Sequence, residues 1–276
     1  MIGAGLSARR RPVVLGALAV CVAVVVIIAV VVIRAVLPED VHPADQATPG
    51  PVVLVPGFGG GTAALQVLAA ALEKAGRQTA IVPATGDDTG DLREQAQTLD
   101  DTVDDVLTSS GAPSVDVVGF SAGGVVARIW AREDGGASKA RRIVTLGSPH
   151  HGTDVASLAA AFLGQGCPEA CQQLRPSSDL LDSLNADDET PAGPLWTAIW
   201  SETDETVTPP ESASLEGATD IEVQQVCPGM SLAHGDLPRD PVGVGLVLQA
   251  LSTGDAPATG GGDCAAIRAS GEPATP

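Results

Sequence analysis

Short apolar runs recur along the chain and are separated by amphipathic segments. The runs at residues 51–55, 114–119 and 142–146 are rich in Val, Leu or Ile and are followed by Pro, Phe or Gly. Because they are largely apolar rather than alternating, they are typical of strands that are covered on both faces. Three further strands are expected at residues 78–83, 195–200 and 221–226.

The segments between these runs have helical periodicity. Residues 91–107 place Leu92, Leu99 and Val103 on one face of a helix. Strands that alternate with helices predict an α/β fold with a mostly parallel sheet and helices on both of its faces. Further helices are expected at residues 62–75, 121–132 and 241–251.

An uncharged apolar segment at residues 13–33 follows three consecutive arginines, Arg9 to Arg11. It is long enough to cross the roughly 30 Å hydrocarbon core of a bilayer. The positive-inside rule then keeps residues 1–12 in the cytoplasm and the rest of the chain outside. We therefore expect a transmembrane signal-anchor at residues 13–37 and a single-pass protein of the cell membrane. The alternative is a cleaved signal peptide, whose apolar region is normally shorter, and a secreted protein.

Composition defines the remaining organisation. Residues 38–50 contain prolines and acids without periodicity and are expected to form a linker. Residues 252–276, rich in Gly, Ala, Pro and Thr, are expected to form a flexible tail. Residues 51–251 between them are enough for one domain with a full core. The formal net charge of −19 and the lack of a Lys/Arg cluster in this domain exclude a nucleic-acid-binding class.

Four cysteines follow the apolar segment, which is consistent with export to an oxidising compartment. Four cysteines allow three pairings. Cys167 and Cys171 are four residues apart around Pro168, which favours a bond between them, and Cys227 then pairs with Cys264 by elimination. No histidine lies at metal-ligand spacing from either pair, and no metal or cofactor is expected.

Gly119-Phe120-Ser121-Ala122-Gly123 matches the pattern G-x-S-x-G. An expected strand runs directly into the match and an expected helix follows it, which is the setting of a nucleophile elbow. Such a turn exposes the serine hydroxyl at the carboxyl edge of the sheet. The sequence therefore predicts Ser121 as a nucleophile.

A serine nucleophile needs a general base and an acid that orients the base. His234 follows the last expected strand and leaves room for an acid in the chain order Ser, acid, His. His150 and His151 come too early for that order and are expected to shape the rim of the site. The acid is expected to be Asp204, just beyond the strand at 195–200. Its alternatives are Glu202, Glu205 and Asp220.

The tetrahedral intermediate of acyl transfer needs backbone N–H donors already in place. Ala122, directly after the nucleophile, supplies one, and Phe58 in the glycine-rich loop after the first strand is expected to supply the other. Residues 57–61 of that loop lack the phosphate-binding pattern G-x-x-x-x-G-K-[ST], so nucleotide binding is not expected.

Taken in order, these motifs resemble those of the small bacterial lipases and esterases of the α/β-hydrolase superfamily, with an alanine-rich, lysine-poor composition of actinobacterial type. The resemblance covers residues 51–251 and implies an α/β-hydrolase fold with Ser121, Asp204 and His234 as its triad. Pro56-Gly57 replaces the His-Gly that many relatives carry in the first loop. The matching segments are residues 53–59, 118–124, 144–153, 199–204 and 234–235.

The resemblance implies a serine carboxylic-ester hydrolase of the triacylglycerol lipase or carboxylesterase type, acting on an ester or lipid without a cofactor. An acyltransferase or thioesterase on the same triad is the alternative enzyme, and a non-catalytic, membrane-tethered binding domain is the alternative outside the enzymes. Residues 153–194, which separate two core strands, are expected to form a wall of the acyl pocket. The sequence leaves the oligomeric state open.

The signal-anchor is directly testable. We expect mass spectrometry to recover peptides from residues 1–30 in a carbonate-washed membrane pellet of cells that express the full chain. Their absence, with the rest of the chain recovered from the medium, would contradict the anchor and indicate cleavage.

Overall fold

The computed structural model describes residues 21–22, 24–25, 43–163, 166–254 and 263–272. The chain divides into two units, residues 1–41 and 42–276. The expected N-terminal segment at 1–12 and most of the expected signal-anchor at 13–37 lie outside the described residues. Among the residues that are described, no helix has both the length and the apolar character needed to cross a bilayer.

A parallel sheet of six strands forms the centre of the second unit, in the order β2-β1-β3-β4-β5-β6. The strands β1, β3 and β4 are almost wholly buried, because their apolar runs are covered on both faces. The strands are β1 (Val52–Val55), β2 (Thr79–Ile81), β3 (Val115–Phe120), β4 (Ala140–Leu146), β5 (Leu195–Trp200) and β6 (Thr219–Glu222).

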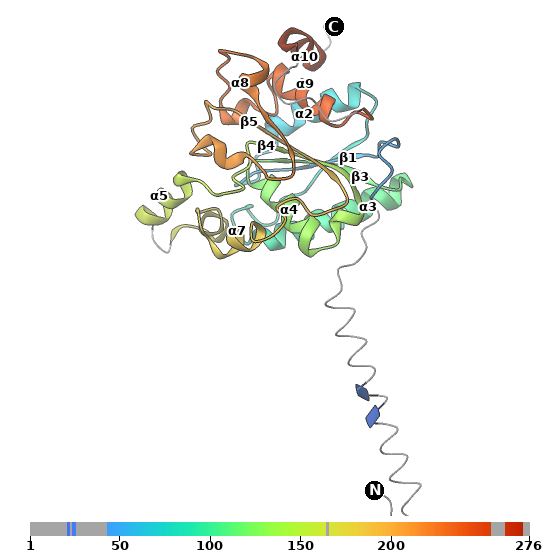
Figure 1. Cartoon of the computed structure of the whole chain (residues 1–276), viewed down its shortest axis with the longest axis vertical. Coiled ribbons are helices and arrows are strands. Elements are labelled where there is room, and N and C mark those ends of the chain that lie inside the picture. Colours follow the sequence, from blue (N-terminus) through green and yellow to red (C-terminus); the bar gives the residue numbers. More distant parts are fainter. Residues whose placement is uncertain (1–20, 23, 26–42, 164–165, 255–262, 273–276) are drawn as a thin grey trace, which may run out of the picture. The chain divides into compact units, whose positions relative to one another are not determined.

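Two layers of helices cover this sheet (Figure 1). Leu65, Leu68 and Leu72 of α2 share a core cluster with Val244 and Val247 of α9 on one face. The helices α3 and α4 pack against each other and against β1 on the other face. The expected α/β fold with a mostly parallel sheet is therefore confirmed. The four helices are α2 (Ala63–Lys74), α3 (Leu92–Ser110), α4 (Ala122–Glu133) and α9 (Pro241–Ala250).

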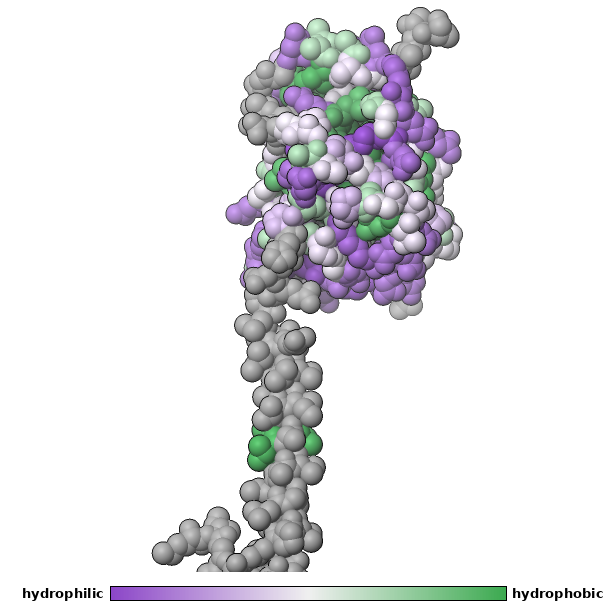
Figure 2. Space-filling view, turned by 90° about the vertical axis from the view of Figure 1, so that its right-hand side faces the viewer, coloured by the Kyte–Doolittle hydropathy of each residue, from purple (hydrophilic) through white to green (hydrophobic). Residues whose placement is uncertain are grey.

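Shorter elements fill the connections. Three helices, α5 to α7, lie between β4 and β5, in the segment that we expected to form a pocket wall. On the face of the second unit seen in Figure 2, hydrophilic residues cover much of the surface and apolar residues are interspersed among them. The connecting elements are α5 (Asp154–Leu163), α6 (Glu169–Gln173), α7 (Asp179–Leu184), α8 (Val223–Val226), α10 (Cys264–Gly271), η1 (Gly136–Ser138), η3 (Pro210–Ala213) and η4 (His234–Asp236).

The structure corrects two expectations. The strand expected at residues 221–226 ends at Glu222, and the chain turns into the short helix α8, which buries Val223 and Val226 on one helical face. The flexible tail expected at 252–276 contains the helix α10. Asp263 caps this helix by accepting hydrogen bonds from the backbone N–H groups of Ala265 and Ala266.

Two disulfides join Cys167 to Cys171 and Cys227 to Cys264, the same pairs that spacing and elimination predict. The first joins the segment before α6 to a residue within that helix. The second attaches α10 to the end of α8, which is why the tail is ordered there despite its composition. Disulfides persist in oxidising compartments, so they indicate an extracytoplasmic or secreted protein.

A buried ion cluster closes the amino-terminal edge of the sheet. Asp116 on β3 has no exposed surface, and its Oδ2 accepts hydrogen bonds from Arg77 and, at 2.6 Å, from Arg141. Arg141 also donates to the carbonyls of Leu251 at the end of α9 and of Gln46. Part of the expected linker therefore packs on the domain.

Removing the Asp116 carboxylate leaves the buried Arg141 guanidinium without its counter-charge. We expect Asp116→Ala to lower the free energy of unfolding by about 3–5 kcal/mol, as measured by urea denaturation. Asp104→Ala, which breaks a solvent-exposed ion pair with Lys139, is the control and should cost less than about 1 kcal/mol. Equal effects of the two substitutions would contradict the role given to Asp116.

Candidate active site

Ser121 occupies a strained turn between β3 and α4. Its backbone angles are φ 55° and ψ −127°, a conformation that residues other than glycine rarely adopt. Such a backbone conformation costs on the order of 1–3 kcal/mol, and it persists only where the surrounding structure fixes the residue in place. Here the Ser121 N–H donates to the carbonyl of Leu146 on β4, at 2.9 Å.

Glycines at both ends of the motif make this turn possible. A Cβ at Gly119 would lie 2.5 Å from the carbonyl oxygen of Gly123. A Cβ at Gly123 would overlap the carbonyl oxygens of Val55 and Pro56. The helix α4 therefore approaches β1 more closely than any side chain permits, and this brings the loop after β1 alongside Ser121.

His234 and Asp204 meet on the same carboxyl side of the sheet. Asp204 follows β5, is 4% exposed, and its Oδ2 lies 2.7 Å from Nδ1 of His234. The other oxygen, Oδ1, accepts hydrogen bonds from the backbone N–H groups of Thr206 and Val207. The carboxylate is therefore fixed, and its bond to Nδ1–H leaves Nε2 of the imidazole as the basic nitrogen.

The imidazole also lies close to the elbow. Its ring centroid is 5.0 Å from that of Phe120, the residue before Ser121. A Cβ at Gly147 would come within 3.2 Å of both the His234 ring and the Asp204 carboxylate, so the end of β4 packs directly against the pair. Within the described residues, the Ser121 hydroxyl itself has no hydrogen-bond partner. Hydrogen bonds between a nucleophile and its general base are often long before substrate binds.

The loop after β1 lies against the nucleophile. A Cβ at Gly57 would be 2.8 Å from the Ser121 Cβ, so the backbone of this loop approaches the hydroxyl closely. The N–H of Gly59 donates to the carbonyl of Asp88, and this bond holds the loop around Phe58. Ala122 is the first residue of α4, and its N–H has no acceptor within the helix.

An apolar cavity of about 520 Å³ opens at Ser121. Its walls come from the loop after β1, from residues 153–174 and from the loop after β5, so the expected insert does contribute a wall. Asp87 and Thr89, in the loop after β2, also line it. These two residues were not among the expected site residues, although they follow the carboxyl end of a strand. The lining residues are Phe58, Asp87, Thr89, Ser121, Pro149, Thr153, Val155, Ala156, Ala159, Gly166, Pro168, Cys171, Leu174, Thr206 and Val207.

His150 and His151 have structural contacts away from the Asp204–His234 pair. His150 is fully buried and bonds to Oγ1 of Thr145; burial lowers its pKa well below the usual value and keeps the ring neutral. His151 bonds to Glu189 at 2.8 Å, which raises the pKa of the imidazole. Both histidines therefore brace the loop after β4, but neither is among the residues that line the cavity beside Ser121, and their expected role at the rim stays a prediction.

The alternative acids lie elsewhere. Glu202 and Glu205 are exposed on the loop after β5. Asp220 accepts a hydrogen bond from the indole of Trp200 and is half-buried, and burial raises its pKa. Among the described residues, no group of three or more His, Cys, Asp or Glu side chains is arranged to hold a metal ion.

Comparison with known proteins agrees with this architecture. The family described as palmitoyl protein thioesterase matches residues 51–185. Lipase B of Aspergillus fumigatus is 18% identical, with a TM-score of 0.65 over 84% of this chain and 59% of the fungal one. The mature lipase BlEst2 of Bacillus licheniformis is 21% identical, with a TM-score of 0.54 over 67% of this chain and 85% of that enzyme. No curated protein matches the sequence.

These likenesses confirm the expected α/β-hydrolase fold and the resemblance to the lipases and esterases that share it. The chain spans about 59% of the length of the fungal lipase. The family match contains Phe58, Ser121 and Ala122 but ends before Asp204 and His234. The pairing of these last two residues is therefore known from the geometry alone.

The close approach at Gly123 gives a prediction about stability. Gly→Ala inside a helix normally gains up to about 1 kcal/mol. Here the added methyl group would overlap two backbone oxygens of β1 and its loop. We expect Gly123→Ala to lower the free energy of unfolding by about 1–3 kcal/mol, as measured by thermal or urea unfolding.

Gly61→Ala, in the loop after β1, is the control, because nothing lies within 4 Å of a Cβ there. It should change stability by less than about 0.5 kcal/mol. A stabilised Gly123→Ala variant would show that α4 can move away from β1 without cost.

Proposed function

We propose that this α/β-hydrolase is a serine carboxylic-ester hydrolase of the lipase or esterase type, acting outside the cytoplasm. The observation that carries the proposal is the convergence of a strained Ser121 and a bonded His234–Asp204 pair at one carboxyl edge of the sheet, beside an apolar cavity. Strain of this kind clusters at active sites, because it holds a reactive group in one orientation.

The first half of the reaction acylates the serine. His234 Nε2 takes the Ser121 hydroxyl proton as Oγ bonds to the ester carbonyl carbon, and the Phe58 and Ala122 N–H groups stabilise the oxyanion. The imidazolium is stabilised by the Asp204 carboxylate. The ester C–O bond then breaks, and His234 gives its proton to the leaving alcohol oxygen.

The second half of the reaction uses the same groups on water. His234 accepts a proton from the water as its oxygen bonds to the acyl carbon. The bond from that carbon to Ser121 Oγ breaks, and Oγ regains the proton from His234 while the carboxylic acid leaves. The apolar cavity beside Ser121 would hold the acyl chain, and no cofactor takes part.

The family match to palmitoyl protein thioesterases favours a second candidate, hydrolysis of an acyl thioester on the same residues. The chemistry differs only in the leaving atom, which is sulfur instead of oxygen. An acyltransferase would use the same acyl-enzyme, with an alcohol replacing water in its second half. For the location, we propose a single-pass anchor at residues 13–37 with the enzyme outside; the two disulfides support export, and a secreted form is the alternative.

The triad predicts a specific loss of activity. We expect the full chain in detergent, under oxidising conditions, to hydrolyse p-nitrophenyl esters. Ser121→Ala should lower turnover by about 10⁴-fold or more. Ser109→Ala, at an exposed serine at the end of α3, should leave turnover unchanged. The measurement is p-nitrophenol release across short to long acyl chains.

The relative activity on different substrates distinguishes the candidate functions. A long-chain optimum indicates a lipase and a short-chain optimum an esterase. Faster turnover of matched acyl thioesters would move the assignment to a thioesterase, and ester formation with an added alcohol to an acyltransferase. No activity on any of these, together with no fluorophosphonate labelling of Ser121, would contradict the enzyme and favour a binding domain.

A further inference from the structure

Asp204 and His234 stand on two separate loops. The acid loop, residues 201–207, follows β5, and the histidine loop, residues 227–240, joins α8 to α9. A catalytic pair must be held within about 0.5 Å of its working geometry by contacts from the surrounding residues. The single hydrogen bond between the two side chains cannot by itself fix both loops.

We infer that Gln224 is a positioning residue that couples these two loops and so sets the orientation of His234 toward Asp204. It lies on α8, is 7% exposed, and uses both ends of its amide. Its Oε1 accepts the backbone N–H of Glu202 at 2.9 Å, and its Nε2 donates to Oγ of Ser201 at 3.0 Å.

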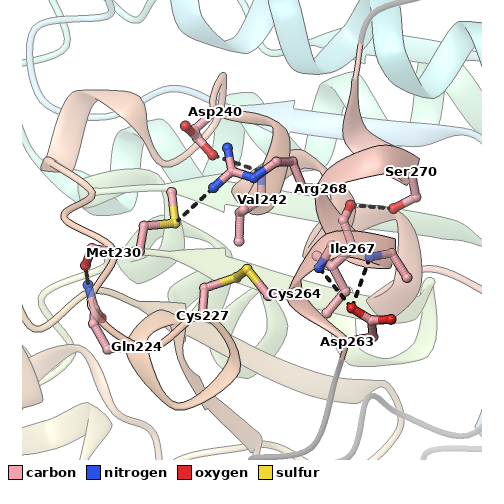
Figure 3. Close-up of a disulfide and its surroundings, with 12 residues drawn as sticks. Gln224, Cys227, Met230, Asp240, Val242, Asp263, Cys264, Ile267, Arg268 and Ser270 are labelled. Carbon is pink, nitrogen blue, oxygen red and sulfur yellow. Dashed lines mark hydrogen bonds between the residues drawn. A yellow bond between two sulfur atoms is a disulfide. The ribbon is translucent and has the colours of Figure 1, made fainter.

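The same Nε2 also donates to the carbonyl of Met230 at 3.0 Å, a bond that Figure 3 shows from Gln224 across to the histidine loop. One buried amide therefore bonds to the acid loop twice and to the histidine loop once. Only an amide offers an acceptor and two donors in this arrangement. A carboxylate would keep the acceptor and lose both donors, and an aliphatic side chain would lose all three bonds.

A second bridge runs in parallel. Oγ1 of Thr203, the residue before Asp204, donates to the carbonyl of Leu232 at 3.1 Å and accepts its N–H at 2.9 Å. The hydroxyl thus joins the two loops next to the acid. Gln224 lies further from the acid along the chain, and its three bonds hold the base of the acid loop and the first half of the histidine loop.

The histidine loop is also fixed at both ends. The Cys227–Cys264 disulfide ties its start to α10, and the Arg268 guanidinium of α10 contacts the Met230 sulfur at 3.8 Å (Figure 3). The helix α10 packs so closely on α9, where the loop ends, that a Cβ at Gly245 would overlap the carbonyl of Ile267. Between these ends, the buried Leu232 and Leu237 pack in the core, and Gln224 and Thr203 supply the hydrogen bonds that join the middle of the loop to the acid loop.

This inference rests on the proposed function for its kinetic consequence but not for its structural one. A displacement of about 1 Å in a catalytic group can cost about 100-fold in rate. We expect Gln224→Glu, which preserves shape, to lower kcat for a p-nitrophenyl ester by about 10- to 100-fold. KM should change by less than about 2-fold, because Gln224 does not line the cavity.

Gln225 supplies the matched control. It is the next residue on α8, is exposed, and bonds only to Glu222 among the described residues. Gln225→Leu should retain the wild-type kcat, and Gln224→Leu should lose at least as much as Gln224→Glu. Thermal unfolding of each variant checks that the protein is folded at the assay temperature.

A measurement independent of activity tests the geometry. The chain has four histidines, so nitrogen NMR of ring-labelled protein, with His234→Ala for assignment, reports which nitrogen of His234 carries the proton. We expect the wild type and Gln225→Leu to show the proton on Nδ1, and folded Gln224→Glu to show a mixture of tautomers or a shifted Nδ1–H signal.

An unchanged His234 signal and an unchanged kcat in folded Gln224→Glu would overturn the inference. If the wild type has no hydrolytic activity and Ser121 does not react with a fluorophosphonate, the proposed function fails. The NMR comparison still decides whether Gln224 sets the His234–Asp204 geometry. The two failures are therefore distinguishable.

Discussion

The close approach of α4 to β1 at Ser121 is the constraint on which the rest of the site depends. Glycines at positions 119 and 123 let the strand-to-helix turn be tight enough to hold Ser121 at a positive φ. The same approach brings the loop around Phe58 beside the hydroxyl. A larger residue at Gly123 would push α4 away from the loop after β1 and so separate the proposed nucleophile from Phe58, one of the two proposed oxyanion donors.

The parallel sheet then determines where the other groups meet. Because all six strands run in one direction, the loops after β3, β5 and β6 emerge at the same edge. Ser121, Asp204 and the α8 segment that precedes His234 come from those three loops. The opposite edge has a different role: there Asp116 and Arg141 form a buried pair that ties the end of α9 to the sheet. The buried ion pair that stabilises the fold and the groups of the proposed chemistry thus lie at opposite edges of the sheet.

The carboxyl-terminal part of the chain acts as a clamp on the histidine loop. Its disulfide and the packing of α10 on α9 fix the two ends of the loop, and Gln224 and Thr203 hold its middle against the acid loop. These covalent and hydrogen-bonded contacts act together with apolar burial, because Leu232, Leu237 and Ile267 belong to the core cluster.

The sequence by itself determined the strands and helices of the core, the turn at Ser121 and the order of the chemical groups, because these depend on local periodicity and on motifs a few residues long. It erred at 223–226 and at 264–271, where α8 and α10 form through tertiary burial and through the bond between Cys227 and Cys264. The sequence favoured Asp204 as the acid, but only the tertiary structure showed that Asp204, and not one of the three alternative acids, bonds to His234. Only the tertiary structure revealed Gln224. Both depend on contacts between loops far apart in the sequence, and no local pattern encodes which of several similar side chains will face the same neighbour.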